Sequence, residues 1–435
     1  VNTGSGDPVQ VVCGAPNARA GMKGVFAPAG AYVPGIDLVL KAGNIRGQDS
    51  NGMLCSEREM MISDEHDGII DLDQDAPVGE SFAAWAGLDD PVIEIAITPN
   101  RADCLGVRGV ARDLAAAGYG TLKPLDTSAH EGSFDSPVTW RLDLDGAEHL
   151  APLITGIAFR GVTNGPSPDW MARRLNAIGQ RPISALVDIT NYVMFDLGRP
   201  LHAYDIDKIH GSELIVRQAD GGEPFAALNE KTYEMEAGMI TIGDAEGVDD
   251  LAGVMGGERT GVSDGTTGMF LEIAVFDPIS VAATGRKLNL NSDARYRFER
   301  GLDSESPVWA AGHIARMVTD ICGGEASVPV TMGPGVGWQR SIFLGAGKVE
   351  SLTGMVIDEG EQQRILEALG FTVTAADGGF DVAPPSWRGD IDGAADLVEE
   401  IARIRGFDHL PMDHLPREDV VAKPSLSPAQ ARLFR

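Results

Sequence analysis

The 435-residue sequence predicts a multidomain α+β protein that begins with a small β-barrel and carries a small α/β domain near residue 400. Three observations support this prediction. Residues 1–86 are short β-rich segments broken by glycine and proline, and residues 172–334 alternate strands and helices without a fixed repeat. Residues 338–411 combine a strand with two helical patterns. A chain of this length is expected to form two to four domains.

The composition is typical of a soluble globular protein, with 43% hydrophobic and 23% charged residues. The absence of an apolar run of eighteen residues argues against a membrane span. The four cysteines lie far apart without a C-x-x-C pair, which argues against a zinc ribbon and a disulfide framework and favours the cytoplasm. Because the sequence starts at Val1 without a signal core and stops inside a helical pattern, we expect a piece of a longer protein.

The net charge of -29 argues against nucleic-acid binding when it is taken alone. Phosphate contacts supply most of the affinity of nucleic-acid binders, and those contacts need a basic surface. A nucleic-acid function therefore requires a local basic patch or a basic partner subunit.

Residues 1–86 contain the segments VQVVCGAP, MKGVFAPAG and IDLVLKAGNIRG, which favour a small β-barrel. Residues 87–171 form a connecting α+β region. Here the alternation from Val92 to Ile97 predicts a strand, and Asp103 is expected to cap a helix that runs to about Ala117.

The segment DITNYVMFDLGRPLHAYD places polar side chains along one partly apolar stretch of residues 172–334: Thr190, Asn191, Arg199 and His202. Such side chains around a pocket floor bind an acyl group and position a water molecule. The glycine-rich DLAGVMGGERTGV lacks the endings of a phosphate loop and of a dinucleotide motif, so we interpret its glycines as allowing close approach of the backbone to a ligand.

The segment 281–300 is locally basic. It interleaves Tyr296 and Phe298 with five cations, a pattern suited to phosphate and unstacked bases: Arg286, Lys287, Arg295, Arg297 and Arg300. The alternative is a segment whose cations pair with the excess acid elsewhere in the chain.

The apolar positions Leu397, Ile401 and Ile404 predict a helix that starts after Asp392 and stops at Gly406. Its residues Asp396, Glu399 and Glu400 are close along the helix, and Asp390 lies in the preceding loop. Four converging carboxylates without histidine or cysteine would suit a hard cation such as Mg²⁺. The alternative is an acidic first turn stabilised by the helix dipole, with Arg403 paired to Glu399.

Four groups of motifs occur in one order that resembles the beta subunit of bacterial phenylalanine–tRNA synthetase. They are VVCGAPN with the turn SNGML, TPNRADCLG, DITNYV with GRPLHAYD, and SWRGDIDGAADLVEEIARIRGFDHLP. The resemblance implies a tRNA-binding oligonucleotide-fold barrel at 1–86, an editing module at 172–334 and a magnesium-carrying domain at 338–411. Residues 412–435 would then begin a further domain.

By this resemblance, the editing pocket comprises Thr190, Asn191, His202, Ala252, Gly253, Glu272, Ser292 and Ala294. Glu272 would accept the hydroxyl of tyrosine, and His202 would orient the ester or a water. From the residues alone, His202 also fits a satisfied core histidine and Glu272 a strand-edge charge. The resemblance likewise implies Mg²⁺ ligands at Asp390, Asp396, Glu399 and Glu400. The family often has threonine at Ser292 and an aromatic residue at Gly389.

The resemblance implies a ligase that attaches phenylalanine to tRNA(Phe) with ATP. The alpha subunit would bind ATP and phenylalanine, and two alpha and two beta subunits would form the enzyme. This chain would bind tRNA, hydrolyse mischarged tyrosyl-tRNA(Phe), carry Mg²⁺ and contact the alpha subunit. Two alternatives stay open: a non-catalytic tRNA-binding or assembly module, and a metal-dependent hydrolase that uses the carboxylates at 390–400.

Overall fold

The computed structural model describes residues 1–4, 6–89, 91–412 and 426–434, which fall into two compact units. The first unit is Val1–Glu94 with Ala177–Gly179, and the second is Ile95–Asn176 with Gln180–Arg435. Most of the further domain expected at 412–435 lies outside the described residues, which show only helix α11 (Pro428–Leu433) there. In the described part of the chain, every helix is too short or too polar to cross a membrane.

The first unit contains three separate pairs of short antiparallel strands. Strand β1 (Phe26–Pro28) pairs with β6 (Gly52–Leu54), β2 (Tyr32–Val33) with β3 (Leu38–Val39), and β4 (Gly43–Ile45) with β5 (Gln48–Ser50). Helix α1 (Phe82–Trp85) follows them. The expected β-rich character is present, but the described residues do not form a closed barrel. Each strand has only two or three residues, so each ladder ends before another strand joins it.

The strand predicted from Val92 to Ile97 is absent from the structure. These residues have no regular secondary structure, and Val92, Ile93 and Ile95 are exposed. Within the described residues no strand pairs with them, so the alternating pattern has no ladder to join. Helix α2 (Val107–Ala116) follows, and its N-cap is Gly106 rather than Asp103. The carboxylate of Asp103 instead accepts hydrogen bonds from two arginines, described below.

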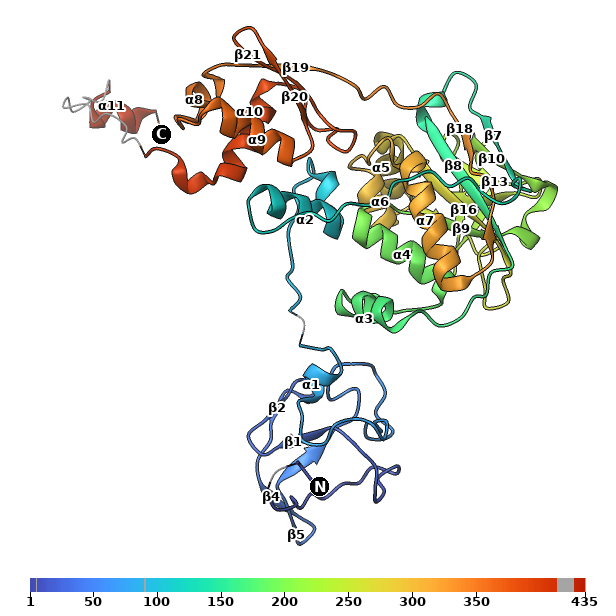
Figure 1. Cartoon of the computed structure of the whole chain (residues 1–435), viewed down its shortest axis with the longest axis vertical. Coiled ribbons are helices and arrows are strands. Elements are labelled where there is room, and N and C mark those ends of the chain that lie inside the picture. Colours follow the sequence, from blue (N-terminus) through green and yellow to red (C-terminus); the bar gives the residue numbers. More distant parts are fainter. Residues whose placement is uncertain (5, 90, 413–425, 435) are drawn as a thin grey trace. The chain divides into compact units, whose positions relative to one another are not determined.

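Two five-stranded sheets form the middle of the second unit (Figure 1). The first has the order β15-β14-β13-β10-β7, and the second has β17-β8-β16-β9 with β18 also paired to β8. The strands are β7 (Thr139–Asp143), β8 (Leu153–Arg160), β9 (His202–Asp205), β10 (Glu213–Gln218), β13 (Ile240–Gly243), β14 (Val248–Leu251), β15 (Met255–Gly256), β16 (Gly268–Val275), β17 (Glu325–Ala326) and β18 (Val330–Met332). A separate hairpin joins β11 (Pro224–Ala227) to β12 (Lys231–Glu234).

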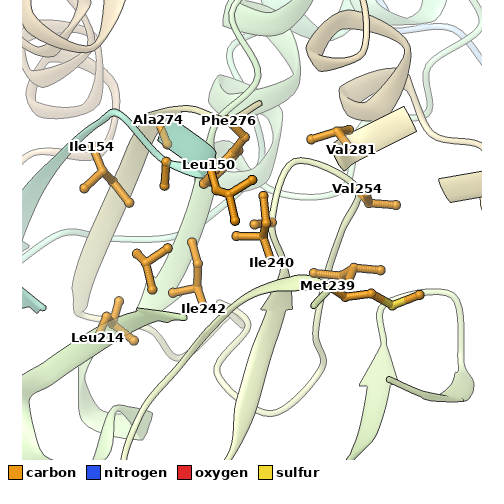
Figure 2. Close-up of a cluster of buried hydrophobic side chains, with 14 of the residues drawn as sticks. Leu150, Ile154, Leu214, Met239, Ile240, Ile242, Val254, Ala274, Phe276 and Val281 are labelled. Atoms are coloured by element: carbon orange, nitrogen blue, oxygen red, sulfur yellow. The ribbon is translucent and has the colours of Figure 1, made fainter. Parts of the chain in front are cut away.

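The second sheet has a hydrophobic core on each of its faces. On one face, Ile154, Phe270 and Ala274 join a cluster with residues of the first sheet, part of which Figure 2 shows. On the other face, Ile157, Leu271 and neighbouring side chains pack against helices α4 and α7. The helices of this region are α3 (Asp169–Ala177), α4 (Ala185–Leu197), α5 (Pro278–Lys287), α6 (Asp293–Phe298) and α7 (Ser306–Cys322). Strand side chains alternate between faces, so the position of a residue along β16 decides which core it enters.

The C-terminal part combines a three-stranded antiparallel sheet with three helices. The sheet order is β19-β21-β20, from β19 (Ile342–Gly345), β20 (Thr372–Ala376) and β21 (Gly379–Ala383). The helices are α8 (Lys348–Thr353), α9 (Glu359–Ala368) and α10 (Ala394–Arg405). The predicted helix bounds are confirmed, since α10 begins after Gly393 and ends before Gly406. Leu397 and Ile401 are fully buried in this core and Ile404 packs against it, as the apolar spacing predicts.

Candidate functional site

A cluster of buried polar side chains lies on the face of the second sheet that contacts the first sheet. Glu272 on β16 is the direct register partner of His202 on β9, and Phe270 is the partner of Tyr204. Because alternate residues of a strand share a face, Glu272, His202 and Tyr204 enter the same layer. Glu272 thus occupies a position between Phe270 and Ala274 where an apolar side chain would be expected.

The phenol of Tyr204 connects two carboxyl groups. Its hydroxyl lies 3.1 Å from Oε2 of Glu272 and 3.4 Å from Oδ2 of Asp250, which is on β14. Nδ1 of His202 lies 3.7 Å from the same Asp250 oxygen, and the His202 ring meets Tyr204 edge-on with 4.4 Å between centroids. Tyr204 is fully buried, and Glu272 and Asp250 are each 5% exposed.

The two carboxyl groups lack a cationic partner. Among the described residues, neither Glu272 nor Asp250 forms an ion pair with lysine or arginine, although the charge of Arg199 acts to lower the pKa of Glu272. Arg199 donates instead to the carbonyl oxygens of Pro200 and Ala274 and to Oγ of Ser306. Burial raises the pKa of Glu272 to about 7, raises the pKa of Asp250 well above its usual range and lowers the pKa of His202 to about 4. The imidazole is therefore neutral at pH 7.

Four further predicted residues lie in two adjoining segments, the loop after β14 and the start of α6. Ser292 caps α6 by accepting from the Arg295 N–H at 3.0 Å, and its hydroxyl donates to the carbonyl oxygen of Val254 at 2.6 Å. Ala252 is buried in this loop, and Gly253 has φ +69°, which favours glycine. Ala294 packs against the core beside them. The Ser292 bond to Val254 thus joins the start of α6, which carries Ser292 and Ala294, to the loop that carries Ala252 and Gly253.

The glycine-rich stretch approaches the polar cluster itself. A Cβ added at Gly256 would lie 2.2 Å from Cε1 of His202, and one at Gly257 would lie 2.5 Å from the Asp249 carbonyl oxygen. Gly256 therefore allows the loop to pass close to His202, and Gly257 allows it to pass close to the backbone of β14. We expected these glycines to let the backbone come close to a ligand. At Gly256 and Gly257 the backbone instead comes close to other residues of the protein.

Thr190 and Asn191 belong to α4, whose apolar side chains pack on the opposite face of the same sheet. The Thr190 hydroxyl donates to the carbonyl oxygen of Val187 within the helix at 2.7 Å. In the described residues no hydrogen bond links either residue to His202 or Glu272. The structure therefore does not bring them into direct contact with the polar cluster.

Sequence reasoning missed Tyr204 and Asp250. Two signals were present: His202 and Tyr204 stand two residues apart in one strand, so they share a face, and the pair Asp249-Asp250 stands directly before the apolar run LAGVM. Asp249 is completely buried, and burial raises its pKa to about 6 although Arg259 binds it at 2.6 Å.

The basic segment 281–300 is mostly occupied with internal contacts. Arg295 and Arg297 are buried, and they donate to backbone and side-chain oxygens such as the carbonyls of Leu290 and Leu105. The remaining cations are arranged as follows: Arg300 stacks on Tyr296 and pairs with Glu299, Lys287 pairs with Glu236, and Arg286 is exposed. The expected patch of five cations is therefore not presented on the surface, because two of them stabilise the core.

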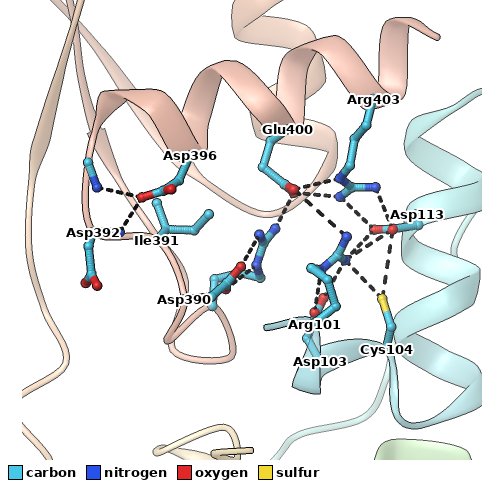
Figure 3. Close-up of polar contacts among 12 residues, drawn as sticks. Arg101, Asp103, Cys104, Asp113, Asp390, Ile391, Asp392, Asp396, Glu400 and Arg403 are labelled. Carbon is cyan, nitrogen blue, oxygen red and sulfur yellow. Dashed lines mark hydrogen bonds and ion pairs between the residues drawn. The ribbon is translucent and has the colours of Figure 1, made fainter. Parts of the chain in front are cut away.

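Three of the four predicted magnesium ligands, Asp390, Asp396 and Glu400, have hydrogen-bond partners of their own (Figure 3). Asp390 pairs with Arg388 through two bonds of 2.8 Å, and Glu400 pairs with Arg388 and with Arg403 at 2.6 Å. Asp396 accepts from the backbone N–H groups of residues 392 and 393, both at 2.9 Å, and Glu399 is exposed. Arg403 thus pairs with Glu400 and not with Glu399. Burial disfavours the Glu400 charge, but hydrogen bonds from Arg403 and Arg388 hold its pKa at about 2.

The turn at residues 101–104 and Asp113 of helix α2 add to this network of charges. Arg101 donates to Asp103 at 2.9 Å, to Sγ of Cys104 at 3.0 Å and to Asp113 at 3.0 Å, and Arg403 reaches Asp113 at 2.7 Å. Within the described residues, Asp103, Cys104 and Asp113 are the one group with three potential metal-ligand atoms within 4.8 Å. Because a guanidinium already binds all three, this group is an ion-pair network.

Comparison with known proteins assigns three regions of the chain. Residues 1–81 match a putative tRNA binding domain, residues 150–323 match the B3/4 domain and residues 342–407 match the tRNA synthetase B5 domain. The phenylalanine–tRNA ligase beta subunit of Cereibacter sphaeroides is 53% identical over 98% of the chain and 52% of its own length. That of Brucella abortus is 50% identical over 99% of the chain and 54% of its length. The chain spans about half the length of these curated relatives.

One solved structure is also similar, an N-terminal fragment of the phenylalanyl-tRNA synthetase beta subunit from Pyrococcus horikoshii. It is 18% identical, covers 76% of this chain and 95% of the fragment, and has a TM-score of 0.40.

Proposed function

The chain belongs to the family of phenylalanine–tRNA ligase beta subunits, and on that premise we propose that it binds tRNA and hydrolyses mischarged tyrosyl-tRNA(Phe). The observation that carries the proposal is the buried Glu272, held by Tyr204 inside the B3/4 region. A carboxyl group without a cation is costly to bury in a hydrophobic core. Its retention there suits a site that recognises a polar group on a ligand.

A ligase for phenylalanine needs such a site because tyrosine differs only by one hydroxyl. A hydrophobic pocket rejects a hydroxyl-bearing analogue by only about a hundredfold. A second site built to hydrogen-bond the hydroxyl discriminates far better, since phenylalanine would leave its buried polar group unpaired. We assign this acceptor role to Glu272.

The other predicted residues take supporting roles. His202 is neutral at pH 7 and so orients the ester or a water by hydrogen bonding. Ala252, Gly253, Ser292 and Ala294 form one wall, as their adjoining positions suggest. Thr190 and Asn191 lie on α4, against the opposite face of the sheet, so we assign them no direct contact with the group that Glu272 binds.

The test is deacylation of tyrosyl-tRNA(Phe) by the full-length beta subunit assembled with its alpha subunit. Glu272→Ala and His202→Ala are expected to reduce deacylation at least tenfold, whereas Glu234→Ala, an exposed glutamate on β12, should leave it unchanged. Wild-type deacylation in both site variants would overturn the assignment. If the variants still bound tRNA normally in that case, a non-catalytic tRNA-binding or assembly module would be the better interpretation.

The domain organisation follows from the same premise. Residues 1–86 would be the oligonucleotide-fold tRNA-binding part, 87–171 the connection, 172–334 the editing module, 338–411 the magnesium-carrying domain and 412–435 the start of the next domain. The whole enzyme would be a cytoplasmic heterotetramer of two alpha and two beta subunits, in which the alpha subunit binds ATP and phenylalanine.

Mg²⁺ fits the carboxylates of α10 in part. In the described part of the chain no arginine pairs with Asp396 or Glu399, whereas Asp390 and Glu400 are already neutralised by Arg388 and Arg403. Mg²⁺ usually binds one or two carboxylates and keeps several waters. Asp396 and Glu399 would therefore hold it first, and the ion would neutralise this end of the helix.

Titration calorimetry of Mg²⁺ with the full-length beta subunit tests the metal assignment. Asp396→Ala and Glu399→Ala should weaken binding, and Glu359→Ala in the first turn of α9 provides a matched control. Equal affinity in all three variants would contradict the proposal. The alternative of a metal-dependent hydrolase at residues 390–400 has less support, because two of its four carboxylates are tied to arginines.

A further inference from the structure

The contacts of Tyr204 impose a limit on protons in the buried cluster. A phenol carries one hydrogen, yet the Tyr204 hydroxyl lies within hydrogen-bond distance of both Glu272 and Asp250. If both carboxyls were ionised, one of them would face the phenol oxygen without a hydrogen between them. Two uncompensated charges in one buried layer would also repel each other. The arrangement is satisfied when one of the two carboxyls keeps its proton.

The surrounding charges favour Asp250 as the protonated group. Asp250 is adjacent to Asp249 on β14, and His202 beside it is neutral, so its neighbourhood contributes negative charge and no cation. Arg259 is committed to Asp249 and Asp244. Glu272, in contrast, has the favourable influence of Arg199 and the shorter bond to Tyr204.

We propose that Tyr204 and Asp250 are positioning residues that keep Glu272 in the form that accepts a hydrogen bond. Asp250 retains its proton and donates to the Tyr204 oxygen, and Tyr204 donates its own hydrogen to the Glu272 carboxylate. The second lone pairs of Glu272 stay available for the hydroxyl of a tyrosyl ester. This inference rests on the editing function proposed above and adds the residues that set its pH dependence.

The hydrogen bonds from Asp250 to Tyr204 and from Tyr204 to Glu272 predict that one conservative variant shifts the pH midpoint of editing and that another does not. Tyr204→Phe removes the donor that stabilises the Glu272 anion, so the pH midpoint of editing should rise by about one unit and activity at neutral pH should fall. Asp250→Asn keeps a neutral donor at the same place, so the midpoint should stay within about 0.3 units of the wild type. Tyr233→Phe on β12 is the matched control for loss of a phenol hydroxyl.

The experiment measures deacylation of tyrosyl-tRNA(Phe) against pH with the assembled full-length enzyme. An unmoved midpoint in Tyr204→Phe, or a fall of one unit or more in Asp250→Asn, would overturn the inference. The second result would mean that Asp250 is ionised in the wild type. Glu272→Gln separates the two proposals: wild-type editing in that variant defeats the editing assignment, whereas lost editing with an unmoved Tyr204→Phe midpoint defeats only this inference.

Infrared spectroscopy keeps the inference testable if Tyr204→Phe does not fold. The wild-type protein at pH 8.5, where Glu272 is ionised, should show a protonated carboxyl band that is absent in Asp250→Asn and present in Glu272→Gln. A band that disappears in Glu272→Gln and persists in Asp250→Asn would place the proton on Glu272 and overturn the inference.

Discussion

The polar cluster around Tyr204 and the network around Glu400 use buried carboxylates in opposite ways. Glu272 is 5% and Glu400 is 2% exposed, so both lose most of their contact with water. The pKa of Glu272 rises to about 7, whereas that of Glu400 falls to about 2. The difference lies in the arginines: Arg388 and Arg403 bind Glu400 directly, and Glu272 has a phenol instead. A paired acid stabilises the fold, and an unpaired one remains available to a ligand.

The largest expected effect comes from removing an arginine from the ion pairs around Glu400. Arg388→Ala would leave Glu400 and Asp390 without their shared guanidinium, and loss of one partner from a buried ion pair costs about 3–5 kcal/mol. Chemical denaturation should show this loss in the unfolding of the C-terminal part.

The matched control is Arg364→Ala, which removes an exposed pair with Glu361 on α9. Exposed pairs contribute only about 0.2–1 kcal/mol. Similar losses in both variants would show that Arg388 does not neutralise buried acid.

In the cluster around Tyr204, the stability contribution of Glu272 should depend on pH, because no arginine pairs with this carboxyl group. The folded-state pKa of Glu272, about 7, lies above its ordinary value of 4.5, so its stabilising contribution is present below pH 4.5 and is lost as the pH rises through 7. Between pH 5 and pH 8 the wild type should lose about 2 kcal/mol relative to Glu272→Gln. Denaturant titrations at several pH values measure this difference in the free energy of unfolding. If the free energies of the two proteins changed equally with pH, the pKa of Glu272 would not be raised.

The smallest effect concerns the geometry of the paired region. Arg403→Lys keeps the charge but loses the fork that reaches both Glu400 and Asp113. Lysine cannot reproduce a two-pronged contact, so we expect a loss of about 1 kcal/mol in denaturant unfolding. Arg364→Lys is the control, and an equal change there would mean that net charge alone matters.

The sequence predicted those parts of the fold whose patterns are local. The stripe Leu397, Ile401 and Ile404 placed α10 correctly, because helix periodicity and the glycines at both ends depend on nearby residues alone. The strand predicted from Val92 to Ile97 was wrong, since a strand also needs a partner, which no local pattern supplies. The cap predicted at Asp103 was wrong because Arg101 and Arg112 bind that carboxylate.

The candidate site shows the same limit. The resemblance named Glu272 and His202, and the structure makes them ladder partners, a pairing over 70 residues of sequence that periodicity does not reveal. Asp250 lies on the first sheet and contacts Tyr204 of the second, so its place in the cluster depends on how the two sheets pack. The sequence placed Asp390, Asp396, Glu399 and Glu400 near one another, but it did not show that Arg388 pairs with Asp390 and Glu400, or that Arg403 pairs with Glu400 rather than Glu399. Mg²⁺ binding stays a prediction.

Helix α2 has a consequence for the order in which the chain folds. Asp113 forms an ion pair with Arg403, which lies 290 residues later in the sequence. Contacts between such distant residues form late, since the intervening chain must be made and its loop closed first. During synthesis, Asp113, which neighbours Cys104, therefore lacks its contact with Arg403 until helix α10 has been made. A nascent chain stopped before residue 403 should leave Cys104 more reactive toward thiol reagents than the finished protein does.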